Sequence, residues 1–152
     1  MTEVYFPRPV DSPAVQQLQA QLDGALRLTS GEDLPDKAEY HILIAGRPTK
    51  AQIEASPNLH TLVIPWAGLP VETAALMPNY PHIAIHNIHH NAVTTAETAM
   101  TLMMAAAKGL IPIERTFRKN DWRPRYAPNP ALTLDGKTAL ILGYGSIGQA
   151  VG

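Results

Sequence analysis

Six residues near the C-terminal end of the sequence have the types and spacing of a phosphate-binding turn. They form a G-x-G-x-x-G motif, here called the glycine turn: Gly143, Tyr144, Gly145, Ser146, Ile147 and Gly148. In such a motif the first glycine permits a tight strand-to-helix turn, the second lets the backbone approach a pyrophosphate, and the third allows close helix packing. Amides at the N-terminus of the following helix would face the anion. The motif therefore predicts binding of a dinucleotide cofactor.

The glycine turn needs a strand before it and a helix after it. The apolar run Ala139–Leu142 predicts a short strand buried on both faces. A second strand and an acidic residue about 20 residues further on would bind the ribose, but the sequence ends at Gly152. We therefore expect the turn to begin a domain whose remainder lies outside these residues.

The bulk composition favours an ordinary water-soluble protein. The 152 residues are 45% hydrophobic and 16% charged, with a net charge of −1 and no cysteine. This charge gives no electrostatic reason to expect binding to nucleic acid or to a membrane. No signal peptide is expected at the start, and the apolar segment 99–113 is too short to span a bilayer. The predicted location is cytoplasmic.

The first part of the chain alternates short apolar runs with helical patterns. Strands are predicted at Val4–Phe6, Leu26–Leu28, His41–Ala45, Leu62–Ile64 and Ile83–Ile85. Such alternation predicts an α/β fold with a mainly parallel sheet. Ligands of these sheets lie beyond the carboxyl ends of the strands. That rule selects three loops: 46–49, 65–70 and 86–91.

A long helix is predicted over residues 92–119, rich in alanine and methionine, with a kink or break at Pro112. The residues 120–130 are polar and rich in proline, which indicates a connector. A domain boundary is therefore expected within or just after the helix.

Three segments together resemble the D-isomer-specific 2-hydroxyacid dehydrogenases. Asn91–Glu97 is similar to the family's N-x-x-x-V-A-E segment, with Thr95 where valine is usual. Trp122 followed by Leu134–Thr138 is similar to its W…L-x-G-K-T entry to the cofactor domain. Leu142–Gly148 is similar to its L-G-x-G-x-I-G fingerprint. The resemblance is specific from about residue 60 to the end of the sequence.

The resemblance implies three regions in this chain. Residues 1–98 would be a flavodoxin-like substrate domain with a parallel sheet, and residues 99–130 an interdomain helix and connector. Residues 131–152 would be the first strand and turn of a Rossmann domain that binds NAD or NADP. The intact protein would be a homodimer that transfers hydride between this cofactor and a small 2-hydroxy or 2-keto acid. The family's catalytic arginine, acidic residue and histidine all follow the fingerprint, so this chain is expected to contain no catalytic residue and to be inactive alone.

The resemblance also implies residues for the substrate and the nicotinamide. The backbone amides of Ala67 and Gly68 would hold the substrate carboxylate, since amides donate directionally to an oxyanion. The family more often shows G-x-G-x-D where this chain has residues 65–70, and an ordinary glycine–proline turn is the alternative. Asn91 would bind substrate or cap a helix. Thr95 would lie near the nicotinamide or bond to a preceding carbonyl.

Other functions remain open from the sequence. A non-catalytic relative that senses dinucleotides or binds a partner would share all three segments. Another nucleotide enzyme, such as a methyltransferase or an adenosylhomocysteinase-like protein, would share only the glycine turn. His86, His89 and His90 have spacings that suit a metal site on a helix. They precede the predicted helix and no carboxylate or cysteine accompanies them, so no metal is expected.

Overall fold

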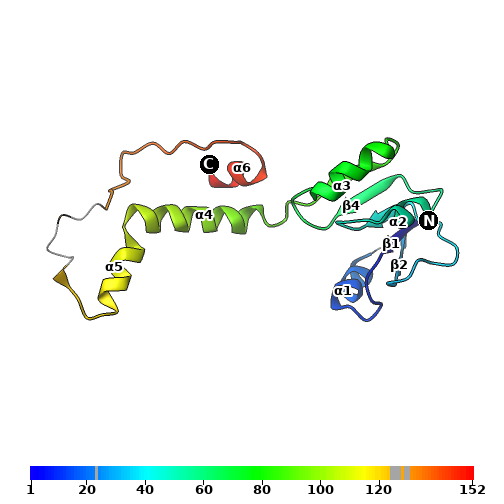
Figure 1. Cartoon of the computed structure of the whole chain (residues 1–152), viewed down its shortest axis with the longest axis horizontal. Coiled ribbons are helices and arrows are strands. Elements are labelled where there is room, and N and C mark those ends of the chain that lie inside the picture. The colour runs from blue at the N-terminus through cyan, green and yellow to red at the C-terminus, as the bar shows by residue number, and fades with distance from the viewer. Residues whose placement is uncertain (23, 124–127, 129–130) are drawn as a thin grey trace. The chain divides into compact units, whose positions relative to one another are not determined.

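The computed structural model describes every residue except 23, 124–127, 129 and 130. The chain forms two compact units, Met1–His89 and His90–Gly152 (Figure 1).

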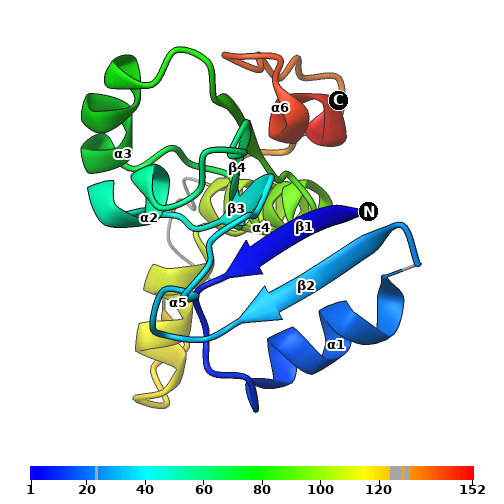
Figure 2. The same cartoon turned by 90° about the vertical axis from the view of Figure 1, so that its right-hand side faces the viewer.

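The first unit is built on a five-stranded sheet in which all pairings are parallel. Its strands are β1 (Thr2–Phe6), β2 (Leu26–Ser30), β3 (Ile42–Ile44), β4 (Thr61–Ile64) and β5 (Ala84–Asn87). They lie in the order β2-β1-β3-β4-β5 (Figure 2). This is the flavodoxin-like strand order. The predicted α/β class with a parallel sheet is confirmed.

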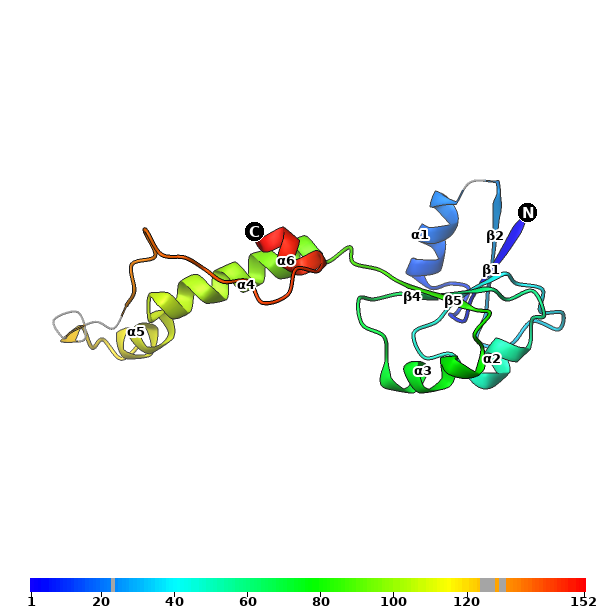
Figure 3. The same ribbon diagram turned by 90° about the horizontal axis from the view of Figure 1, so that it is seen from above.

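Helices cover both faces of this sheet. In Figure 3, α1 (Pro13–Gln21) lies on one side of the strands, and α2 (Lys50–Glu54) and α3 (Val71–Leu76) lie on the other. A short 3₁₀ helix, Met77–Asn79, follows α3. The start of α2 is fixed by a capping box. The Thr49 hydroxyl accepts from the Gln52 amide at 3.1 Å, and the Gln52 side chain accepts from the Thr49 amide at 2.9 Å.

The core lies between the sheet and the helices α2 and α3. Leu43, Leu62 and Ile64 project from β3 and β4 and are at most 1% exposed. The ring of Tyr5 stacks on that of Tyr40, with centroids 5.0 Å apart. Both hydroxyls are satisfied: Tyr5 donates to two loop carbonyls and Tyr40 donates to the carbonyl of Gln52. The tyrosine pair therefore fixes the chain around the ends of the central strands.

The second unit contains the helices α4 (Ala92–Ala107), α5 (Leu110–Phe117) and α6 (Ser146–Val151). The predicted long helix is broken at Gly109, which has a left-handed φ of +60°, and not at Pro112. Pro112 falls in the first turn of α5, where a proline removes no intrahelical hydrogen bond. The break is completed by a hydrogen bond of 2.6 Å from the Leu132 amide to the Ala107 carbonyl. The position of the proline was therefore the wrong indicator, because a glycine can leave the helical conformation at lower cost.

The predicted strand at Ala139–Leu142 is absent. These residues have no regular secondary structure, and the side chains of Leu140 and Leu142 are 90% and 98% exposed. The described residues of this unit contain no other strand, and a strand needs a neighbour to satisfy its amides and carbonyls. The connector predicted at 120–130 falls partly on 124–127 and 129–130, which lie outside the described residues.

The tyrosine pair predicts a pH dependence of stability. Burial, with a smaller contribution from Tyr5, raises the pKa of Tyr40 to about 12. The folded state therefore favours the protonated phenol, and this stabilisation is complete below the unfolded-state pKa near 10 and is lost as the pH rises towards 12. In urea unfolding, the Tyr40→Phe variant should lose about 1 kcal/mol at neutral pH through its missing hydrogen bond. Its free energy of unfolding should then fall less than that of the unmodified chain between about pH 9 and pH 11.

The matched control for this prediction is Tyr144→Phe, since the Tyr144 side chain is 70% exposed. This variant should follow the unmodified chain at every pH. If the free energy of unfolding fell between about pH 9 and pH 11 by the same amount in the Tyr40→Phe variant as in the unmodified chain, the role given to Tyr40 would be contradicted.

Candidate ligand pocket and glycine turn

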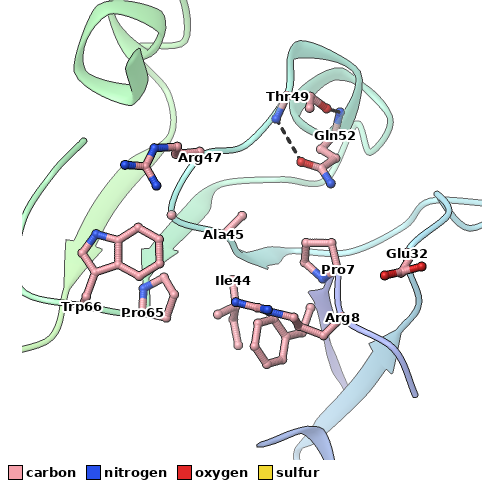
Figure 4. A pocket seen from close by; sticks show the side chains of 12 residues that line it. Pro7, Arg8, Glu32, Ile44, Ala45, Arg47, Thr49, Gln52, Pro65 and Trp66 are labelled. Atoms are coloured by element: carbon pink, nitrogen blue, oxygen red, sulfur yellow. Dashed lines mark hydrogen bonds between the residues drawn. The ribbon is translucent and has the colours of Figure 1, made fainter. Parts of the chain in front are cut away.

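A pocket of about 350 Å³ opens at the carboxyl ends of three neighbouring strands (Figure 4). It is lined by Phe6–Arg8 after β1, by Ile44–Arg47 after β3, and by Pro65 and Trp66 after β4. The strand order reverses between β1 and β3, because the chain continues from β1 to β2 on one side and from β3 to β5 on the other. Such a switch point is the usual ligand site of an open parallel sheet.

The indole of Trp66 forms one wall of the pocket and lies directly against Gly46. A β-carbon built on Gly46 would fall 1.8 Å from the Trp66 ring. The guanidinium carbon of Arg47 lies 5.9 Å from the centre of the same ring. The carbonyl of Gly46 accepts a 2.8 Å hydrogen bond from the buried hydroxyl of Thr73 on α3. Glycine is therefore required here so that the two loops can approach each other.

The two residues predicted to hold a carboxylate, Ala67 and Gly68, follow Trp66 and lie next to the pocket rather than in its lining. Their loop is fixed by Asn87, whose side-chain amide donates to the Ala67 carbonyl at 2.5 Å, and by the Ile88 amide, which donates to the Trp66 carbonyl at 3.4 Å. Within the described part of the chain, the amides of Ala67 and Gly68 donate no hydrogen bond. Both amides are therefore available to an oxyanion.

Asn91 occupies the N-cap position of α4, but its side chain makes no capping hydrogen bond. The Thr95 side chain, like that of Asn91, makes no hydrogen bond to the helix backbone, and in this it differs from the other threonines of α4. The hydroxyls of Thr94, Thr98 and Thr101 each donate to a carbonyl three or four residues earlier. No such bond is made by the half-buried Thr95. Its hydroxyl and the Asn91 side chain are thus not committed to the helix backbone.

The glycine turn has the local geometry that a dinucleotide site requires. Gly143 has a φ of +96°, which makes the turn, and α6 begins at Ser146. A β-carbon on Gly148 would lie 2.2 Å from the Gly143 carbonyl oxygen, whereas a β-carbon on Gly145 would meet no atom within 4 Å. Gly148 thus serves close packing, and Gly145 leaves open space for the approach of a ligand. The helix α6 packs against α4 (Figures 1 and 3).

The predicted site residues are divided between the two units. Ala67 and Gly68 belong to Met1–His89, while Asn91, Thr95 and the glycine turn belong to His90–Gly152. The sequence interpretation missed Arg8, Arg47, Trp66 and Asn87 as parts of the pocket and its support. The carboxyl-end rule had selected the loops of the last three, but the segment that follows the predicted strand Val4–Phe6 was not among the selected loops. Among the described residues, no group of three or more histidine, cysteine or acidic side chains could hold a metal ion.

The first unit is thus an α/β domain with a pocket at the switch point of its sheet, and the second unit carries a glycine turn of the kind found in nucleotide-binding proteins. Comparisons with known proteins show what the chain resembles. Residues 100–152 match the family described as "D-isomer specific 2-hydroxyacid dehydrogenase, NAD binding domain". A D-3-phosphoglycerate dehydrogenase from Archaeoglobus fulgidus is 23% identical over 158 residues, covering 98% of this chain and 29% of that protein. A glyoxylate reductase from Korarchaeum cryptofilum is 40% identical over 60 residues, covering 38% of this chain and 18% of that protein.

A solved structure of a D-isomer specific 2-hydroxyacid dehydrogenase family protein from Aeromonas salmonicida superposes with a TM-score of 0.69 at 20% identity. The match covers 99% of this chain and 48% of that chain, so the chain spans about half the length of this relative. The resemblance predicted from the sequence is supported by the match of residues 100–152 to the NAD binding domain of that family, and the superposition shows a shared fold. In the part that the structure describes, no helix has the length and apolar character needed to cross a membrane.

The contact between Trp66 and Gly46 can be tested with a pair of glycine substitutions. Gly46→Ala should push the indole out of its place, which destabilises the first unit by about 1–3 kcal/mol through overpacking and moves the Trp66 fluorescence to longer wavelength. Gly68→Ala is the control, because a β-carbon there meets no atom within 4 Å. Both variants are made with Trp122→Phe, so that Trp66 is the only tryptophan. Equal unfolding free energies and equal spectra for the two variants would show that the contact does not hold the loops.

Proposed function

We propose that the chain is part of an oxidoreductase that transfers hydride between NAD or NADP and a small D-2-hydroxy acid or its 2-keto acid. The observation that carries this proposal is the glycine turn. Residues 100–152, which match the family's NAD binding domain, include a turn with an open position at Gly145 and close packing at Gly148. The activity and the substrate of the whole protein are proposed here on the basis of this turn and the family match.

The proposal gives each region a role. Residues 1–98 form the substrate domain, residues 99–130 the interdomain helix and connector, and residues 131–152 the start of the cofactor domain. The free amides of Ala67 and Gly68 bind the substrate carboxylate, and the uncommitted side chain of Asn91 is assigned to substrate binding by the family resemblance. Uncharged amide donors suit this task, since they orient the carboxylate without forming a competing ion pair. A homodimer and a cytoplasmic location remain predictions of the family resemblance.

The cofactor binds the glycine turn in this proposal. The first-turn amides of α6 (Ser146–Val151) have no acceptor within the helix, so they can donate to a pyrophosphate. Gly145 lets the phosphate oxygens come close to the backbone, while Tyr144 and Ile147 are exposed beside it. Thr95 lies near the nicotinamide, and its hydroxyl is free to form a hydrogen bond there. The bound nicotinamide supplies or accepts the hydride.

The 152-residue chain alone should not catalyse hydride transfer. The catalytic arginine, acidic residue and histidine implied by the family resemblance have no counterpart in it, so substrate activation and proton transfer are missing. The test is to follow the absorbance of NADH or NADPH with the purified chain and a panel of 2-keto acids. Turnover above that of a buffer blank would refute this prediction.

The protein translated from the complete reading frame around these residues provides the positive test. It should oxidise NADH or NADPH with at least one 2-keto acid. Dinucleotide binding without turnover would favour a non-catalytic sensor, and neither binding nor turnover would refute the proposal.

The role of Gly145 can be separated from that of a structural glycine in the same full-length protein. Gly145→Ala should lower the affinity for the cofactor about tenfold or more, which is about 1.4 kcal/mol, because its methyl group fills the space needed by the pyrophosphate. The thermal midpoint without cofactor should not change, since no protein atom lies within 4 Å of that position. Gly24→Ala, where the surroundings are equally open, is the control and should change neither quantity. An unchanged cofactor affinity in the Gly145→Ala variant would remove this glycine from the site.

A further inference from the structure

We propose that the pocket at the switch point selects substrates with a second anionic group, and that Arg8 is the residue that recognises this group. The inference rests on the proposed function and narrows its substrate to 2-keto or 2-hydroxy acids that carry a carboxylate or phosphate at the end remote from the reacting carbon.

The charge distribution around the pocket distinguishes Arg8 from its neighbours. Arg47 has a carboxylate partner, since its Nε lies 3.5 Å from an oxygen of Glu72. Arg8 makes no ion pair with any described residue. Its guanidinium carbon lies 6.0 Å from the centre of the Phe6 ring, which orients the side chain along the pocket. Arg8 is thus the lining cation whose charge is not matched within the described protein.

The direction of the side chains agrees with this role. In Figure 4 the guanidinium of Arg8 extends towards Ile44 and Pro65, and Glu32 lies on the other side of Pro7. Ile44, Pro65 and the Phe6 ring line the same space and are all partly buried. An anion that enters there leaves part of its water shell, so its attraction to a guanidinium is stronger than at an open surface.

The position of the pocket fits one end of a bifunctional acid. Trp66 forms its wall and is followed directly by Ala67 and Gly68, whose amides are free for the first carboxylate. A volume of about 350 Å³ is at the lower end of the range for small-molecule sites. A short carbon chain can therefore extend from the Ala67–Gly68 loop past Trp66 towards Arg8. An arginine also suits carboxylate and phosphate alike, because both accept two parallel hydrogen bonds from its planar group.

The fluorescence of Trp66 in the 152-residue chain provides a direct test. At constant ionic strength and about pH 5, where a phosphate monoester carries mainly one negative charge, the Trp122→Phe chain is titrated with the dianions 2-oxoglutarate and 3-phosphoglycerate and with the monoanion 2-oxobutyrate. Both dianions should bind at least about tenfold more tightly than the monoanion, as expected for a hydrogen-bonded charge. A preference for one dianion identifies the remote group as carboxylate or phosphate.

Substitutions then assign the preference to Arg8. Arg8→Gln should remove most of the preference for the dianions and leave 2-oxobutyrate binding unchanged. Arg115→Gln is the matched control, since Arg115 is an exposed arginine of α5 and does not line the pocket. Glu32→Gln should strengthen dianion binding modestly by removing a like charge. Equal binding of the monoanion and dianions, equal losses in Arg8→Gln and Arg115→Gln, or no response to any probe would each overturn the inference.

Failure of this inference is distinguishable from failure of the proposed function. Turnover of monocarboxylic 2-keto acids alone by the full-length protein would refute the role of Arg8 and support the oxidoreductase. Selective binding of dianions by the 152-residue chain, together with no turnover of any 2-keto acid by the full-length protein, would support the role of Arg8 and refute the oxidoreductase.

Discussion

The parallel pairing of β1 with both β2 and β3 is the constraint on which the first unit depends. Each parallel connection has to return the chain to the same edge of the sheet, so the carboxyl ends of all five strands face one way. The chain passes from β1 to β2 on one side of β1, and later passes from β3 to β4 on the other side. The loops that follow β1 and β3 therefore lead in opposite directions. The pocket is a direct consequence of this divergence and would form with many different side chains.

What makes the pocket specific to this chain is the approach of two loops at Gly46 and Trp66. The absence of a side chain on Gly46 lets the indole lie against the backbone, and the bond from Thr73 to the Gly46 carbonyl fixes that backbone to α3. Trp66 directly precedes Ala67 and Gly68, and Asn87 holds this loop by donating a hydrogen bond to the Ala67 carbonyl. The large ring stands at the place where the family often has a smaller glycine-rich loop. A change at this single contact thus alters both the size of the pocket and the placement of its donors.

The sequence was informative wherever a local signal decides the structure. Short apolar runs predicted all five strands of the sheet, because the spacing of apolar residues is a local property of the sequence. The carboxyl-end rule predicted the loops around Gly46 and Trp66 as ligand loops. The direction of the Arg8 side chain was out of reach, since it depends on the Phe6 ring and on neighbours from two other strands. The helix break was also misplaced, because proline is harmless in a first helical turn and Gly109 was not weighed against it.

The glycine turn shows how far local geometry can form without its sheet. The apolar residues before it have no regular secondary structure, Leu140 and Leu142 are exposed, and no strand lies beside them among the described residues of their unit. The turn nevertheless has its left-handed Gly143, its contact between Gly148 and the Gly143 carbonyl, and a helix that starts at Ser146. These features follow from three glycines and from packing within about six residues, so they do not require the strand. Only a sheet would bury the exposed apolar side chains of Leu140 and Leu142, which precede the turn. The geometry of the turn and the assembly of a sheet are thus separate properties of one short segment, and only the first is encoded within the segment itself.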